Sequence, residues 1–132
     1  MHLPIAWLLL AFGLEIWPRR AKGEAFRACA KPLAWLCLLS VLPAAASGWL
    51  RADEMFPTGE PPELLSLHGT LMLVASGLLL LLAGARQGLA AWVKTRVGHW
   101  TLRGLLGLAL LLMAWGAHLG GKLVYGADHL PW

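Results

Sequence analysis

The stretch Leu64–Gly84, LLSLHGTLMLVASGLLLLLAG, decides the fold of this chain, because none of its 21 residues is Asp, Glu, Lys or Arg. The hydrocarbon core of a bilayer is about 30 Å thick, and a helix needs roughly 20 apolar residues to cross it. Pro61-Pro62-Glu63 precedes the stretch and Arg86 follows it. The stretch therefore predicts one membrane-spanning helix.

Three further apolar runs predict three further spans, at about 3–17, 32–50 and 102–120. The first run is short for a full span, and Pro18-Arg19-Arg20 closes it. Pro43 predicts a kink in the second run. Segment 87–100 mixes Trp and Val with Lys, Arg and His, which is typical of a stretch lying on the membrane surface. We predict an all-α, integral membrane, up-down four-helix bundle that forms a single domain over residues 1–132.

The composition agrees with a membrane protein. The chain has 132 residues, of which 58% are apolar and 14% are charged, and its mean hydropathy is +0.64. Soluble domains contain roughly a quarter charged residues. The net charge of +4 does not indicate a nucleic-acid-binding protein, because long uncharged runs separate the basic residues.

The distribution of basic residues predicts the orientation of the bundle. Nine of the eleven Lys and Arg residues fall in two segments, 18–31 and 86–103. Positively charged loops stay in the cytoplasm. We therefore expect both termini and loop 51–63 to face the periplasm, in a bacterial inner membrane that the chain crosses several times.

The histidines are the candidate functional residues. Three predicted spans each bring one histidine to the outer membrane level, namely His2, His68 and His118, and His129 follows in the tail. Ionisable groups within spans are costly and mark functional sites. His99 lies among cytoplasmic basic residues, and we expect it to face the membrane interface.

The spacing of small residues in the last span predicts which side faces the bundle interior. Gly104, Gly107, Leu111, Ala114 and His118 fall on one face of a helix. Small residues on one face let helices approach closely in lipid. We therefore expect His118 to point inward.

Imidazole suits haem iron, copper and zinc, and we expect one haem b near the periplasmic face. His68 is the first choice of axial ligand, with His118 or His2 opposite. The expected surroundings are space left by Gly69, Ala114 and Gly116, a wall of Trp115 and Met72, and propionate partners Arg51 or Lys122. Copper is an alternative cofactor, since Met1, Met55 and Met72 add sulfur at the same level. A further alternative is a protein without metal.

Four blocks of sequence, His2–Ala6, Gly48–Ala52, Glu63–His68 and Ala117–Gly126, together resemble one family. It is a bacterial predicted-membrane-protein domain of unknown function, which opens with a His-Phe-Pro-Ile-like signature and closes with a Gly-Gly-x-Leu-Val-Tyr-like one. Some members are fused to c-type cytochrome modules. The resemblance implies a four-span fold, an association with respiratory electron transfer, and recurrent histidines at His2, His68 and His118.

The chain departs from the family pattern at its start. Leu3 stands where the family usually has Phe, and no further histidine precedes His2. The sequence also contains no CxxCH motif, so a haem here would be non-covalently bound.

These features predict a b-type cytochrome-like membrane subunit that transfers electrons between quinol and a periplasmic acceptor such as a cytochrome c. We expect it to belong to a larger membrane complex or oligomer, as an electron carrier more than a stand-alone enzyme. The alternatives are a metal-free structural or accessory subunit of a respiratory complex and a periplasmic-side copper-binding protein.

Overall fold

The computed structural model describes residues 2–16, 23–56 and 62–126 of the chain. These residues form helices and their connections, without a β-strand. The helices are α1 (His2–Ile16), α2 (Gly23–Met55), α3 (Glu63–Gly88), α4 (Ala90–Val93) and α5 (Arg96–Tyr125).

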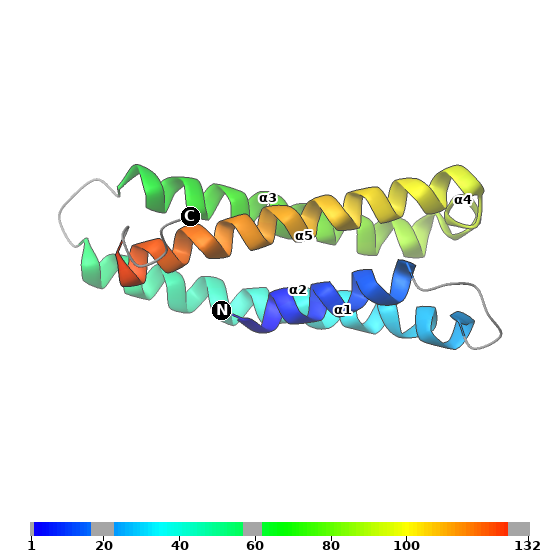
Figure 1. The fold of residues 1–132 in the computed structure, drawn as a ribbon, viewed down its shortest axis with the longest axis horizontal. Helices are drawn as coiled ribbons and strands as arrows, with labels where there is room; N and C mark the ends of the chain where they lie inside the picture. The colour runs from blue at the N-terminus through cyan, green and yellow to red at the C-terminus, as the bar shows by residue number, and fades with distance from the viewer. Residues whose placement is uncertain (1, 17–22, 57–61, 127–132) are drawn as a thin grey trace.

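Four of these helices form an elongated up-down bundle (Figure 1). Helix α1 packs on α2 and α5, and α3 packs on α5 and α2, so α1 and α3 lie diagonally across the bundle. The single-turn helix α4 lies at one end, between α3 and α5 (Figure 1). We call this the α4 end, and the end at which α2 finishes and α3 begins the opposite end.

The connection at the α4 end is short because local signals stop one helix and start the next. The Leu89 amide donates to the Ala85 carbonyl and ends α3. Thr95 caps α5, since its hydroxyl accepts a hydrogen bond from the Gly98 amide at 3.0 Å. A side-chain acceptor at this position satisfies an amide that has no partner within the helix. The segment predicted to lie on the membrane surface is thus the end of α3, the α4 turn and the first turn of α5.

Three helices are long and apolar enough to cross a membrane: Pro32–Met55, Glu63–Gly88 and Arg96–Tyr125. Helix α1 has 15 residues, which corresponds to about 22 Å at 1.5 Å per residue. This length is less than the hydrocarbon core. The structure therefore gives three candidate spans and one shorter apolar helix in place of the four predicted spans.

Helix α2 is longer than its apolar run predicts. It begins at Gly23 and continues through Pro32 and Pro43 to Met55. A proline within a helix removes one backbone hydrogen bond, and membrane helices tolerate this loss when nearby groups satisfy the freed carbonyl. The hydrophobic run marks the part of α2 suited to lipid, whereas the helix extends beyond it.

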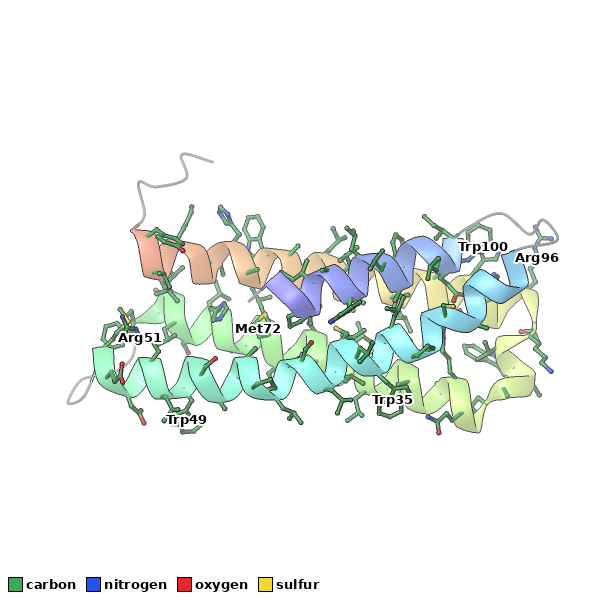
Figure 2. All side chains as sticks on the ribbon, turned by 90° about the horizontal axis from the view of Figure 1, so that it is seen from below. Trp35, Trp49, Arg51, Met72, Arg96 and Trp100 are labelled. Atoms are coloured by element: carbon green, nitrogen blue, oxygen red, sulfur yellow. The ribbon has the colours of Figure 1, made fainter. Side chains whose placement is uncertain are left out.

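The core lies between the four long helices and is apolar. Its most buried large side chains are Leu8, Leu79, Leu102, Met113 and Cys37, one or more from each long helix. Many apolar side chains point outward instead, and Figure 2 shows Trp35 and Trp49 directed away from the bundle on α2. Apolar residues on the outside of a helix bundle match a lipid surrounding.

The inward face of α5 differs from the predicted one. Its buried residues are Gly98, Leu102, Leu106, Ala109, Met113, Gly116 and Leu119. The predicted inward face is largely outward, since Gly104 and Ala114 are exposed and Leu111 is 69% exposed. The prediction was wrong because α5 carries apolar residues on all sides, so hydropathy does not mark the side that meets other helices.

Candidate functional site

His68 lies in the first turns of α3 and packs directly against α5. Its Nδ1 is 2.6 Å from the carbonyl oxygen of Gly116. A carbonyl oxygen accepts hydrogen bonds and cannot donate them, so this contact fixes the proton on Nδ1 and leaves the lone pair on Nε2. The side chain is half-buried. This is the arrangement in which an imidazole can bind a metal through Nε2.

The glycines of α5 make room for α3 side chains at this level. A Cβ at Gly116 would lie 2.9 Å from the Met72 sulfur. A Cβ at Gly120 would lie 2.9 Å from Cε1 of His68. Met72 is therefore next to His68, as predicted, and Figure 2 shows its side chain directed between the helices. The space that Gly116 was predicted to leave for a cofactor is taken up by Met72.

His118 lies on α5 between Gly116 and Gly120, so it shares the level of His68. Successive helix residues are about 100° apart, which puts His118 on the side of α5 roughly opposite the two glycines. Its ring is 5.8 Å from that of Trp115, which is 60% exposed. His118 is half-buried on the flank of α5 and does not point at the α3 interface.

The start of α1 reaches the same level. Phe12 of α1 contacts Gly107 of α5, and the two helices run in opposite directions (Figure 1). Ten residues back from Phe12 is His2, and ten residues on from Gly107 is Ala117. His2 therefore begins α1 beside the level of His118, whereas its side chain, like Met1 and His129, lies outside the described residues.

The remaining predicted residues occupy the surface of the opposite end. Arg51 is exposed and forms an ion pair with Glu54 at 3.0 Å. Lys122 is half-buried in the last turn of α5. Gly69 and Ala114 are exposed, and a Cβ at Gly69 would meet no atom within 4 Å. Met55 is 47% exposed at the end of α2.

Within the described residues, no group of three or more His, Cys, Asp or Glu side chains is placed to hold a metal ion. His68 therefore offers a single imidazole in the described part of the site. A second axial ligand or further metal ligands would have to come from His118 or His2.

A second polar cluster, which the sequence analysis did not identify as a site, lies at the α4 end. Glu15 in the last turn of α1 is buried, with a relative exposure of 4%. Arg86 of α3 forms an ion pair with its carboxylate across the diagonal of the bundle. A buried carboxylate is stable only when it is paired and hydrogen-bonded, so the ion pair explains how α1 can bury Glu15.

Helix α5 completes this cluster with two further residues. Nδ1 of His99 lies 3.5 Å from the Glu15 carboxylate, and the His99 side chain is only 13% exposed. Arg103 donates from Nη2 to the Glu15 backbone carbonyl at 2.7 Å. His99 was expected to face the membrane interface, whereas it packs into this cluster. An acid inside the first apolar run was the sequence signal that could have revealed the cluster.

Comparisons with protein-family models, with curated proteins and with solved structures find no match for this chain. The sequence and the structure thus define a helical protein with three candidate membrane spans. The finer family resemblance stays a hypothesis.

Proposed function

We propose that this protein is a membrane subunit that binds one haem b at the level of His68 and transfers electrons. The observation that carries the proposal is the hydrogen bond between His68 Nδ1 and the Gly116 carbonyl. Histidines that ligate metals usually donate their other ring N–H to a carbonyl or a carboxylate. His68 is therefore oriented and protonated as an axial ligand requires.

The fit of the surrounding residues to a haem is mixed. Gly69 leaves open surface beside His68, because a Cβ there would meet no atom within 4 Å. Gly116 and Gly120 do not leave such space, since Met72 and the His68 ring already contact them. A macrocycle between α3 and α5 thus does not fit, and the proposal needs the half-exposed side of His68.

The other residues have specific roles under this proposal. The second axial ligand is His118 or His2, which share the level of His68. Their position on another side of α5 makes a six-coordinate site with His68 less favourable than ligation by His68 alone. Lys122 is the better propionate partner, because Arg51 is already paired with Glu54. Bound haem iron would accept and release one electron at a time.

The cellular setting follows from charge. We place the α4 end in the cytoplasm, because its segments carry nine of the eleven basic residues and such segments are retained there. His68 then lies near the periplasmic face of a bacterial inner membrane. Electrons would pass between membrane quinol and a periplasmic acceptor such as a cytochrome c, within a larger complex.

An absorption spectrum of the purified protein tests the proposal. We expect a Soret band after expression with adequate haem supply, and its position should shift on reduction with dithionite. A preparation that is folded by circular dichroism but has no Soret band would overturn the haem proposal.

The contacts of His68 also favour a second candidate function, a metal-free accessory subunit of a respiratory membrane complex. In this case the His68 ring joins α3 to α5 through Gly116 and Gly120, and no cofactor is needed. Purification without metal or haem, but with a tightly bound partner, would support this function. Copper found by elemental analysis, and lost in H68A, would instead support copper binding by His68 and Met72.

A further inference from the structure

Most of the basic residues of the chain gather at the α4 end. The sequence of this end, from the last turn of α1 to the start of α2 and from the end of α3 to the start of α5, contains Arg19, Arg20, Lys22, Arg27, Lys31, Arg86, Lys94, Arg96 and Arg103. The acids in the same segments are Glu15 and Glu24. Even if both acids are paired, this end retains a large positive surplus.

Arg103 is the basic residue whose environment is most specific. Its hydrogen bond goes to the Glu15 backbone carbonyl, whereas the Glu15 carboxylate is paired with Arg86. Its Nε is buried without a hydrogen-bond partner among the described residues. The charge of Arg103 is therefore not neutralised by any carboxylate that the structure describes.

The surroundings of Arg103 place it at the edge of the apolar region. Its guanidinium lies 5.3 Å from the centroid of the Trp100 ring, within reach of a cation–π interaction. Trp100 is 62% exposed and Val97 is 70% exposed. Figure 2 shows Trp100 and Arg96 at this end of the bundle. Tryptophan rings concentrate at the level of lipid headgroups.

We propose that Arg103 and Trp100 form a binding site for the phosphate group of an anionic phospholipid. A guanidinium binds phosphate oxygens through paired hydrogen bonds. The exposed Trp100 and Val97 provide apolar surface for the glycerol and upper acyl region, which a free phosphate ion does not use. The lipid phosphate supplies the negative charge that the cluster lacks.

Native mass spectrometry of the full-length protein tests this site. The protein is mixed in detergent with equal amounts of phosphatidylglycerol and phosphatidylcholine, and the ratio of the two retained lipids is measured. We expect the wild type to retain phosphatidylglycerol preferentially. R103Q should lower the ratio about fivefold, because one basic residue near the membrane surface contributes about a factor of that size. R51Q, at the opposite end and paired with Glu54, should leave the ratio unchanged.

The remaining arms separate the possible outcomes. Excess inorganic phosphate should not displace phosphatidylglycerol, and displacement would overturn a lipid-specific site. Equal ratios for R103Q and R51Q would also overturn it. If R103Q loses its helical circular dichroism, W100L decides, because an exposed ring is not part of the core. A lowered ratio in W100L supports the site, and an unchanged ratio overturns it.

Discussion

Arg86 of α3 forms an ion pair with Glu15 of α1 across the diagonal of the bundle. Helices α1 and α3 otherwise pack on α2 and α5 and not on each other. The ion pair is thus the direct link between the two diagonal helices at the α4 end among the described residues. It fixes the depth of α1, which is too short to span the membrane by itself.

Removing the Glu15 charge should strongly destabilise the protein. E15Q leaves Arg86 with a buried charge and no carboxylate, and breaking a buried pair in this way costs about 3–5 kcal/mol. The free energy of unfolding, measured by denaturant titration in detergent micelles, checks this expectation. E54Q is the matched control, because the Arg51–Glu54 pair is exposed and such pairs contribute about 0–1 kcal/mol. Equal losses in E15Q and E54Q would contradict the buried role of Glu15.

A double variant tests the coupling of the same two residues. E15Q/R86Q removes both charges, so neither remains buried without a partner. We expect its loss in the free energy of unfolding to be clearly smaller than the sum of the two single losses. Additive losses would mean that the two side chains do not act on each other.

A methyl group at Gly120 should disturb the α3–α5 contact. In G120A the Cβ would lie 2.9 Å from Cε1 of His68, whose ring is held by the Gly116 carbonyl. We expect a loss of about 1–3 kcal/mol in the free energy of unfolding, as for other overpacked interfaces. In G121A the Cβ meets nothing within 4 Å, so this control should be neutral or gain up to about 1 kcal/mol from helix propensity. The same value for both variants would rule out the close contact.

Replacement of His68 should remove the proposed cofactor. H68A lacks the imidazole whose Nε2 is available, and we expect its Soret absorbance to fall to background. H99A makes the same change in the cluster at the α4 end and should keep the band. Spectra of H118A and H2A then identify the second ligand, if there is one. Full haem retention by H68A would be incompatible with its role as the axial ligand.

Loss of the helix cap at Thr95 should loosen the α4 end. Its hydroxyl accepts from the Gly98 amide at 3.0 Å and donates to the Trp92 carbonyl at 2.7 Å. T95A should lower the free energy of unfolding by about 1 kcal/mol and speed hydrogen exchange at the Gly98 amide. T101A, in the exposed second turn of α5, should change both quantities much less. A similar effect of the two variants would argue against a capping role.

The long apolar helices could be predicted from the sequence, but their bounds could not. Apolar runs at 32–50, 64–84 and 102–120 identify α2, α3 and α5, because a membrane-spanning helix requires a minimum apolar length. Helix α2 begins at Gly23, well before its apolar run, since helical structure continues into polar interfacial sequence. The first run was expected to span, whereas α1 is too short to qualify.

The candidate sites were predictable only in part. His68 could be singled out, because a histidine within an apolar span is rare and costly. Its Gly116 partner could not be identified, since this contact depends on how α5 is rotated against α3. Glu15 and Arg86 are separated by 71 residues, and no spacing rule connects positions so far apart.

The sequence by itself determined the class of this protein, its three long apolar helices and the concentration of positive charge in the segments of the α4 end. These are properties of local composition, which a single stretch of residues carries. Only the tertiary structure decided which side of α5 faces inward, that Met72 fills the space at Gly116, and that Glu15 is paired with Arg86. The physical reason is that helices in lipid are apolar on all sides, so small-residue packing and buried polar pairs, not hydropathy, set their rotation.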